Sequence, residues 1–410
     1  MARTLDVYLH QELVGHLIQD DHGQMVFDYT ESWLENPKAV ALSHSLPLRA
    51  ERFKRNECRG YFAGVLPEEG KREVIARNLG ISARNDFAML EHIGGECAGA
   101  VTFMPAGVPL PVLEYQYREL NDKELARILT ELPRRPLMAG AEGVRLSLAG
   151  AQDKIVVHVA DGRISLPLGG APSTHILKPA IERFEGLVFN EAFCMKLAAA
   201  VEIPSASVSF HQVEGIDYLL VERYDRTHNE TGIVHRLHQE DFCQALGIVA
   251  ESKYQSEGGP GLKECMGLVR AVTSPPVIDL QRLLDAVIFN FLIGNNDAHG
   301  KNFSLLYYGG AIRLAPLYDL LSTSHYPELT KRMAMAIGGE YESSKIFPRH
   351  FEDMAMDAGL GKALVRSRVP ELVKLVISSL DKVDVKHSVA EKLAEEIFER
   401  CKAVLERFGH

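Results

Sequence analysis

The sequence lacks any apolar run long enough to cross a membrane. No apolar stretch approaches the roughly 20 residues that a membrane-spanning helix needs, so we expect no integral membrane protein. The opening stretch MARTLDVYLHQELVG alternates apolar and polar residues instead of forming an apolar signal core, so we expect no secretion signal. A G-x-x-x-x-G-K-[ST] phosphate loop is also missing.

Cysteine is scarce, and the chain has no net positive charge. The six cysteines, at positions 58, 97, 194, 243, 265 and 401, include no C-x-x-C pair and no cluster with histidine. We therefore expect neither a zinc site nor a disulfide framework, and a cytoplasmic location fits best because the cytoplasm is reducing. The net charge of −10 argues against nucleic-acid binding by the chain as a whole, although a local basic patch stays open.

The length of 410 residues, with 46% apolar and 24% charged residues, is typical of a soluble globular protein with two or three domains. A Pro/Gly-rich stretch at 105–112 is the best candidate for a domain boundary. We expect an N-terminal α/β subdomain at 1–107, a β-rich domain at 108–225 and an α-rich domain at 226–410.

The two later domains differ in their apolar patterns. From residue 144 onward we expect strands in VRLSL, KIVVHV, RISLP and HILKP, then a helix in NEAFCMKLAAAV and further strands in ASVSFHQ and DYLLVERY. Beyond about residue 235 we expect helices and a single hairpin. A β-rich part followed by an α-rich part suggests two lobes with a cleft between them.

One polar stretch, NNDAHGKN at 295–302, follows directly on a strongly apolar helix. The apolar residues from Leu280 to Leu292 have the i, i+3, i+4, i+7 spacing of a buried helix face, and Gly294 ends that helix. Next come FSLLYY, a Gly309-Gly310 turn and AIRLAPLYD, which predict a hairpin.

Three side chains of this region suit phosphoryl transfer. Asp297 and Asn302 have the spacing D-x-x-x-x-N, and Asp319 ends the hairpin, which is the layout of a protein-kinase catalytic loop and its metal-binding aspartate. Asp297 suits the carboxylate that takes up the proton of the acceptor hydroxyl, whereas Asn302 and Asp319 supply the oxygen ligands that Mg²⁺ prefers. His299 and Lys301 could face phosphate oxygens. A solvated turn is the alternative, because Asn, Asp and Gly favour turns, but the hairpin and the second aspartate favour the catalytic interpretation.

Three stretches of the β-rich part could bind the nucleotide. Residues 149–154, AGAQDK, form a turn of small residues between two expected strands, and its backbone N–H groups could cover phosphates. This turn is not a G-x-G-x-x-G loop, and an ordinary hairpin turn is the simpler alternative. Lys178 at a strand end could reach the α- and β-phosphates, oriented by Glu191, although most such lysines are simply solvated. The backbone of 222–224 could contact an adenine edge, or could belong to a plain core strand.

Several blocks of the sequence resemble one family. The stretches LSLAGAQDK, THILK, VERYDR, HRLHQEDFCQALG, KYQSEGGPG, LIGNNDAHGKNFS and LAPLYD are similar to those of the HipA family of bacterial serine/threonine kinases, the toxins of HipBA-type toxin–antitoxin pairs. The resemblance extends to HSLPL, FAGVLPEE and IGGECAGAVTFMP near the N-terminus and to KIFPRHF near the C-terminus, and so covers nearly the whole chain. It implies an α+β, two-lobed, protein-kinase-like fold with a β-rich N-lobe, an α-rich C-lobe and an additional small N-terminal α/β subdomain.

The resemblance also implies roles for individual residues. Asp297 would be the catalytic aspartate, Asn302 and Asp319 would bind Mg²⁺, and Ser147 would be the serine on which such kinases phosphorylate themselves and become inactive. A dianionic phosphate there would compete with ATP for the same N–H groups. The residues that would bind ATP are Ala149, Gly150, Ala151, Gln152, Asp153, Lys154, Lys178, Glu222, Arg223, Tyr224, His299, Gly300, Lys301, Asn302, Tyr318 and Asp319.

The partners that the resemblance implies are a HipB-like helix-turn-helix antitoxin and a protein substrate, an aminoacyl-tRNA synthetase, with glutamyl-tRNA synthetase as the first candidate. Some relatives carry a lysine-rich, DNA-contacting stretch before the block that corresponds to KIFPRHF. Here that stretch is GGEYESSK, which is acidic and polar, so we expect operator DNA to be reached only through the antitoxin. Oligomers stay open.

Two other functions fit the same residues. A small-molecule kinase of the same fold, acting on a sugar or aminoglycoside hydroxyl, would share every active-site residue, although it would not need the N-terminal region in this form. A non-catalytic corepressor with a vestigial nucleotide site would bind the antitoxin only, and the complete set of catalytic groups argues against it.

Overall fold

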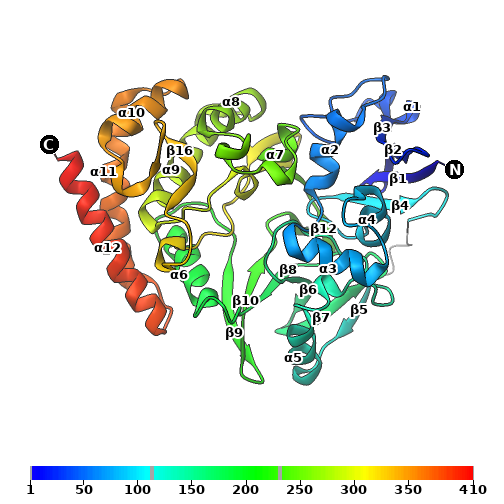
Figure 1. Cartoon of the computed structure of the whole chain (residues 1–410), viewed down its shortest axis with the longest axis horizontal. Helices are drawn as coiled ribbons and strands as arrows, with labels where there is room; N and C mark the ends of the chain where they lie inside the picture. Colours follow the sequence, from blue (N-terminus) through cyan, green and yellow to red (C-terminus); the bar gives the residue numbers. More distant parts are fainter. Residues whose placement is uncertain (1, 111–114, 230–232, 410) are drawn as a thin grey trace. The chain divides into compact units, whose positions relative to one another are not determined.

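The computed structural model describes residues 2–110, 115–229 and 233–409, in helices and strands whose order is drawn in Figure 1. The strands are β1 (Arg3–Leu9), β2 (Glu12–Gln19), β3 (Met25–Tyr29), β4 (Val101–Pro105), β5 (Gln116–Glu119), β6 (Ile155–Ala160), β7 (Arg163–Leu168), β8 (His175–Pro179), β9 (Val208–Val213), β10 (Ile216–Glu222), β11 (Arg226–His228), β12 (Val234–Arg236), β13 (His238–Asp241), β14 (Ser304–Tyr308), β15 (Ala311–Leu314), β16 (Arg332–Ile337) and β17 (Glu340–Glu342). The helices are α1 (Glu31–Leu34), α2 (Arg55–Gly64), α3 (Glu69–Leu79), α4 (Asp86–Ile93), α5 (Asp122–Glu131), α6 (Leu187–Ala200), α7 (Phe242–Ala245), α8 (Leu262–Val272), α9 (Pro276–Ile293), α10 (Pro348–Asp357), α11 (Lys362–Ser379) and α12 (Ser388–Phe408).

The chain divides into two compact units. Unit 1 comprises Met1–Pro179, His211–Glu251 and Leu306–Tyr308, and unit 2 comprises Ala180–Phe210, Ser252–Leu305 and Gly309–His410. The three domains expected from the sequence follow different boundaries and stay a prediction, and part of the stretch 105–112 lies outside the described residues. None of the helices within the described ranges has the length and apolar character needed to cross a membrane.

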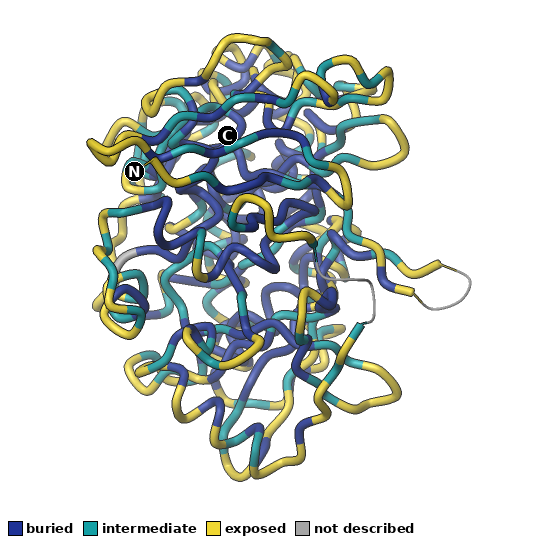
Figure 2. Tube along the Cα trace, turned by 90° about the vertical axis from the view of Figure 1, so that its right-hand side faces the viewer, coloured by how far each residue is buried: buried dark blue, intermediate teal, exposed yellow. Residues whose placement is uncertain are grey.

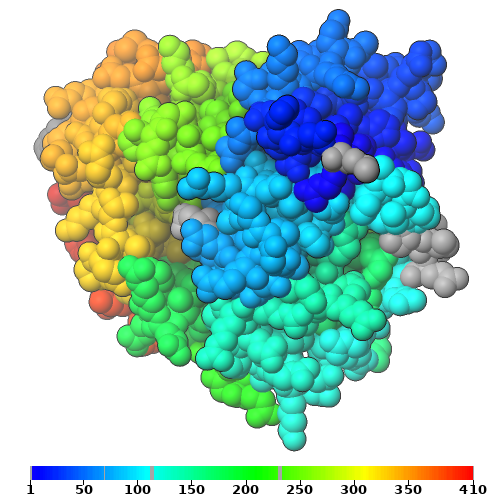
Figure 3. Space-filling model, turned by 45° about the vertical axis from the view of Figure 1, so that its right-hand side comes forward, coloured from blue at the N-terminus to red at the C-terminus, as the bar shows by residue number. Residues whose placement is uncertain are grey.

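Unit 1 begins with a four-stranded antiparallel sheet in the order β3-β2-β1-β4. β2 and β3 alternate buried and less buried positions, as strands with one face on the core do, whereas β1 and β4 have longer runs of buried residues. Figure 2 shows that the exposed residues of the chain gather in its outer turns and the buried ones in the interior. Phe27 of β3 packs against Phe53 and Phe62, with ring centroids 6.0 and 5.2 Å away. The atoms of residues 2–110, blue to cyan in Figure 3, gather in one continuous region of the face shown.

The second sheet has six strands in the order β5-β7-β6-β8-β10-β9. β6 pairs antiparallel with β7 and β8, and β8 pairs antiparallel with β10. The predicted strands KIVVHV, RISLP, HILKP and DYLLVERY correspond to β6, β7, β8 and β10. The turn between β6 and β7 has positive φ at Asp161 and Gly162, as expected from its Ala-Asp-Gly sequence.

The predicted strand VRLSL is wrong. Residues 144–148 form no ladder. Leu146 forms an isolated bridge with Glu96, in which Glu96 N donates to Arg145 O at 2.8 Å and Ser147 N donates to Glu96 O at 2.9 Å. Because β6 pairs with β7 and β8 instead, the turn at 149–154 does not join two paired strands. The alternation of apolar residues in VRLSL reflects burial of Val144, Leu146 and Leu148, not strand pairing.

Unit 2 is mainly helical, and α9, α11 and α12 pack against one another beside α6 (Figure 1). The predicted helix of the apolar stretch is α9, and Gly294 ends it with φ +75°. β14 and β15 form the predicted hairpin with positive φ at Gly309 and Gly310.

The expectation of a single hairpin beyond residue 235 is wrong. Unit 2 contains a second hairpin, β16–β17, with a turn at Gly338 and Gly339. The stretch RMAMAI was not recognised as a strand because Met and Ala favour helices. Its apolar side chains are buried under the segment that follows α9, so tertiary packing outweighs propensity here.

Candidate active site

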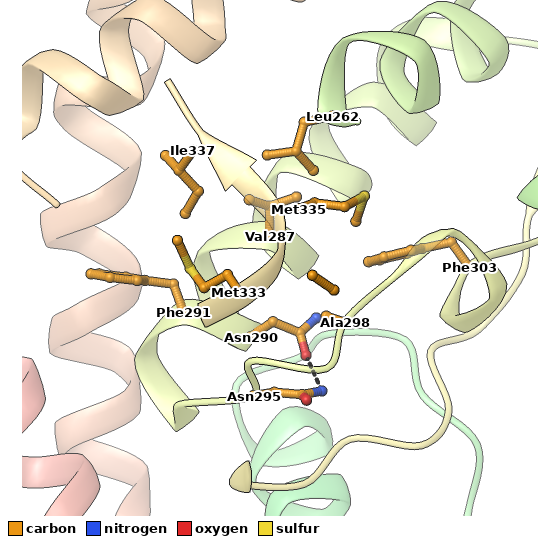
Figure 4. Close-up of a pocket in the computed structure, with 11 residues that line it drawn as sticks. Leu262, Val287, Asn290, Phe291, Asn295, Ala298, Phe303, Met333, Met335 and Ile337 are labelled. Atoms are coloured by element: carbon orange, nitrogen blue, oxygen red, sulfur yellow. Dashed lines mark hydrogen bonds between the residues drawn. The ribbon is translucent and has the colours of Figure 1, made fainter. Parts of the chain in front are cut away.

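Two asparagine side chains, joined by a hydrogen bond, fix the segment that follows α9 (Figure 4). Asn290 donates from Nδ2 to the Ala286 carbonyl at 2.9 Å and accepts on Oδ1 from Asn295 Nδ2 at 2.8 Å. Asn295 in turn accepts the backbone N–H of Asp297 at 3.2 Å. Since Asn290 and Asn295 are buried, these bonds fix the position of the Asp297 backbone relative to α9.

Asn296 bonds the same segment to residues 323–334, which include part of β16. Its backbone N–H donates to Thr323 Oγ1 at 2.8 Å, and its carbonyl accepts the N–H of Ala334 at 2.7 Å. Its side chain donates to the Thr330 carbonyl at 3.3 Å. A cavity of about 30 Å³ lies beneath, lined mainly by apolar side chains of α9 and β16, as Figure 4 shows. The loop is therefore held by strand β16 as well as by α9.

Asp297 is exposed, although Asn295 and Asn296 before it are buried. Its Oδ1 accepts a hydrogen bond from the hydroxyl of Tyr254 at 2.9 Å. An exposed carboxylate on a rigidly held backbone is the arrangement that a general base requires, because it can reach a substrate proton while keeping its geometry. The Tyr254 contact was not predicted from the sequence, although KYQSEGGPG was among the family-like stretches.

Asn302 and Asp319 lie side by side. Asn302 Nδ2 is 3.3 Å from Asp319 Oδ2, and Asn302 Oδ1 accepts the backbone N–H of His299 at 3.1 Å. The pair offers amide and carboxylate oxygens, which are hard ligands suited to Mg²⁺ and unsuited to softer metals. These two residues therefore fit the metal that the sequence implies. The structure bonds Asn302 to Asp319, and the convergence of Asp297 with this pair stays a prediction.

The backbone of Asp319 is in the left-handed region, with φ +60°, a conformation that non-glycine residues adopt mainly where the surrounding structure imposes it. The preceding Tyr318 donates its hydroxyl to the Lys301 carbonyl at 2.7 Å and lies 2.7 Å from Ser304 Oγ. Leu317 is bonded through its N–H to the Pro204 carbonyl at 2.8 Å. The two residues before Asp319 are therefore bonded to the loop at Lys301 and to Pro204, and these bonds fix the backbone that carries Asp319.

The predicted phosphate turn, 149–154, belongs to unit 1 and is tied to the segment before α3. Gly150 has φ +104° and forms a parallel bridge with Pro67. Lys154 Nζ donates to the Ala149 carbonyl at 2.9 Å, and Asp153 forms an ion pair with Lys71 at 2.6 Å. The φ of +104° at position 150 favours glycine, because any other residue would be strained there, and an added side chain would also displace the flexible end of Lys154.

The other predicted nucleotide contacts of unit 1 lie on the sheet. Lys178 is a buried residue of β8 and pairs with Leu219 of β10. Arg223 N donates to the Thr174 carbonyl at 2.9 Å, and its side chain enters a buried ion cluster. Tyr224 donates its hydroxyl to Gln239 Oε1. Nothing in these positions tests nucleotide binding, which stays a prediction for 149–154, Lys178 and 222–224.

The buried ion cluster contains two acids and two arginines. Arg223 pairs with Asp225 at 2.8 Å and with Glu96 at 3.2 Å, and Arg226 pairs with Glu96 at 3.0 Å. Burial raises the pKa of Glu96, but the two guanidinium groups outweigh it, so that its pKa lies well below its ordinary value. The cluster therefore stays fully ionised in an interior where each charge depends on its partners.

Ser147 is fully buried. Its hydroxyl donates to the Val65 carbonyl at 2.8 Å, and its N–H donates to Glu96 O. No phosphate fits in this position, because the hydroxyl points at a carbonyl in a packed interior. Phosphorylation at this serine therefore requires that the segment first leave this place.

Another buried acid of unit 1, Glu240, contacts the end of β14. Glu240 accepts from the hydroxyls of Ser43 and Tyr307, the latter at 2.5 Å, and from the N–H of His44 at 3.0 Å. Burial raises the pKa of Glu240 to about 7, although these bonds oppose the shift. Burial also lowers the pKa of the nearby His238 to about 4. These groups connect the segment at 43–45 to the strand that follows the catalytic loop.

Comparison with known proteins assigns this arrangement. The HipA N-terminal domain matches residues 5–104, and the HipA-like C-terminal domain matches residues 146–401. The serine/threonine-protein kinase toxin HipA of Shewanella oneidensis is 30% identical over 423 residues, covering 98% of this chain and 96% of that protein. The protein Y4mE of Sinorhizobium fredii is 48% identical over 389 residues, covering 93% and 92%.

A solved structure agrees with these sequence matches. The Shewanella oneidensis HipA, determined in a complex with HipB and its operator DNA, has a TM-score of 0.87 and 27% identity over 99% of this chain and 98% of that chain. The fold and these matches thus define a kinase of the serine/threonine class with the predicted α+β kinase-like fold, and this class implies the use of ATP. The chain belongs to the HipA family of toxin kinases.

Proposed function

We propose that this chain transfers the γ-phosphoryl group of ATP to a serine or threonine hydroxyl of a protein, with Asp297 as the general base. The observation that carries the proposal is the exposed Asp297 carboxylate on a backbone held by two buried asparagines, five residues before Asn302, which is bonded to Asp319. In this mechanism Asp297 accepts the proton of the acceptor hydroxyl as that oxygen attacks phosphorus.

Asn302 and Asp319 would hold Mg²⁺, which neutralises the phosphate charge and orients the leaving group when bound. The bond from Asn302 Nδ2 to Asp319 Oδ2 sets the two side chains at one separation before any ligand binds. His299, Gly300 and Lys301 would contact the phosphates from the same loop, and Tyr318 would support the loop through the Lys301 carbonyl.

Residues 149–154, Lys178 and 222–224 would bind the rest of the nucleotide. The positive φ of Gly150 turns the backbone as a phosphate-covering loop requires, and the Asp153–Lys71 pair fixes its far end. Arg223 would contribute only through its backbone, since its guanidinium belongs to the buried ion cluster.

We further propose that the kinase is the toxin of a type II toxin–antitoxin pair. Its substrate would be an aminoacyl-tRNA synthetase, with glutamyl-tRNA synthetase as the first candidate, and its partner a HipB-like antitoxin through which operator DNA is reached. Full-length similarity to a HipA solved with HipB and operator DNA supports the partner. The acidic stretch at 338–345 argues against direct contact with DNA by this chain.

Autophosphorylation at Ser147 would then be self-inactivating for a steric reason. The modified serine could not return to its site against the Val65 carbonyl, and residues 149–154, which follow directly, would lose their position. Mass spectrometry of the chain after incubation with Mg-ATP should find phosphate on Ser147, and a time course should show activity falling as this peptide accumulates. Phosphate on other residues alone would contradict this part of the proposal.

The substitution Asp297→Asn tests the central proposal. The variant keeps size and polarity, so Mg-ATP binding measured by calorimetry should change little. Transfer of labelled phosphate to the chain itself and to lysate proteins should fall by about 10²- to 10⁴-fold, the usual contribution of a general base. Retained transfer would refute the assignment of Asp297.

A further inference from the structure

The stretch 253–261, KYQSEGGPG, forms a rigid turn that the proposed mechanism does not use. The Tyr254 carbonyl accepts the N–H groups of Glu257 and Gly259, each at 2.9 Å. Gly258 has φ +93°, and a side chain at Gly259 would collide with the carbonyls of the residues before Tyr254. These bonds and contacts restrict the backbone of the turn, and the backbone in turn sets the direction of the Tyr254 side chain.

The Tyr254 side chain is held on several sides. Its ring lies edge-on to the His299 ring, with centroids 5.4 Å apart and planes at 75°, and Lys253 Nζ is 5.3 Å from its centre. The next residue, Gln255, accepts the N–H of Ala336 of β16 at 2.7 Å. Since His299 belongs to the catalytic loop and β16 also binds Asn296, the turn and the loop share their supports.

From this place the Tyr254 hydroxyl donates to Asp297 Oδ1 at 2.9 Å. The bond to Asn295 fixes the backbone of Asp297 and does not itself determine the rotation of the carboxylate about its Cβ–Cγ bond. The Tyr254 hydroxyl restrains that rotation, because it bonds to one of the two carboxylate oxygens. Hydrogen bonds to charged groups are also the stronger ones, so this contact is well suited to hold an exposed side chain.

We propose that Tyr254 is a positioning residue that sets the orientation of the Asp297 carboxylate toward the acceptor hydroxyl. The inference rests on the proposed function of Asp297. In the reaction the acceptor O–H bond breaks, its proton moves to the Asp297 carboxylate, the new O–P bond forms and the bond from Pγ to the bridging oxygen of ADP breaks. Tyr254 keeps its own proton throughout and contacts neither ATP nor the acceptor.

The test is Tyr254→Phe in the full-length chain. This change removes the hydroxyl and retains the ring against His299. Tyr326→Phe is the matched control, because it removes one buried hydroxyl, which donates to the Glu185 carbonyl at 3.2 Å, elsewhere in unit 2. The readouts are the maximal initial rate of labelled phosphate transfer from Mg-ATP to lysate proteins, the KM for ATP, and the Kd of a fluorescent ATP analogue.

We expect Tyr254→Phe to lower the maximal rate by roughly 10- to 100-fold, as loss of a hydrogen bond to a charged group implies, with KM and Kd within about twofold of the wild type. The control should keep both the rate and the affinity. A split of this kind separates positioning from folding, since a general structural defect would also weaken ATP binding.

Three outcomes would overturn the inference. A Tyr254→Phe rate within twofold of the wild type would show that the contact does not matter. A rate above the wild type would show that the phenol obstructs the base, and a loss shared with KM and Kd would assign Tyr254 to nucleotide binding. Failure of the proposed function itself looks different, because the wild type would then transfer no more phosphate than Asp297→Asn.

Discussion

The buried acid Glu240 should make the stability of unit 1 depend on pH in an unusual direction. Its pKa in the folded chain is about 7, above its ordinary value of 4.5. Between these values the folded state binds more protons than the unfolded state, so stability is fully present below pH 4.5 and is lost as the pH rises through 7. A difference of about 2.5 pKa units corresponds to roughly 3 kcal/mol.

The substitution Glu240→Gln isolates this effect. Glutamine keeps the size of the side chain and can bond to Ser43 and Tyr307 while carrying no titratable proton. His238, with its pKa lowered to about 4, contributes in the opposite direction, but it is present in both proteins and cancels in their difference. The wild type minus variant free energy of unfolding should therefore fall by roughly 3 kcal/mol between pH 4.5 and pH 7.5.

The assay is urea denaturation followed by the fluorescence of Trp33. This residue is the only tryptophan of the chain and is buried in unit 1, so it reports the unit that contains Glu240. Glu12→Gln, at an exposed position on β2, is the matched control, because it removes one carboxylate outside the core. A flat profile for Glu240→Gln across this range would refute the reasoning.

Three further predictions concern packing and charge. Glu96→Gln leaves two buried arginines with one carboxylate and should cost about 3–5 kcal/mol in chemical denaturation at pH 7, whereas a loss below 1 kcal/mol would contradict the role of the cluster. Gly294→Ala should destabilise the chain more than Gly310→Ala in thermal unfolding, because both have positive φ but only the former would collide with neighbouring side chains; equal losses would assign the effect to φ alone. Lys71→Met should weaken Mg-ATP binding several-fold in calorimetry, since it frees Asp153 and the turn it ends, and an unchanged Kd would show that this anchor is dispensable.

The sequence predicted those parts of the fold that local patterns determine. Helix α9, the hairpin β14–β15 and the central strands β6, β7, β8 and β10 were predicted, because apolar periodicity and glycine turns are local signals. The strands that were missed or misassigned depend on distant partners. VRLSL alternates but meets only an isolated bridge with Glu96, and RMAMAI pairs although its residues favour helices.

In the candidate site, too, local patterns were predictable and contacts between distant residues were not. The spacing of Asp297, Asn302 and Asp319 is a local signal, and the structure bonds the last two to each other. The hydroxyl of Tyr254, by contrast, reaches Asp297 across 43 residues of chain, and no spacing within either stretch encodes that contact. The burial of Ser147 was equally invisible, because a serine in an alternating stretch fits an exposed strand face as well as a packed interior.

The ion cluster around Arg223 also limits how such a kinase can be shortened. Glu96 comes from the segment that matches the N-terminal family domain, whereas Arg223, Asp225 and Arg226 come from the catalytic one. A chain trimmed to the C-terminal family domain would lose Glu96 and leave the two guanidinium groups facing a single carboxylate. We therefore expect such a shortened chain to be more stable when these arginines are replaced as well.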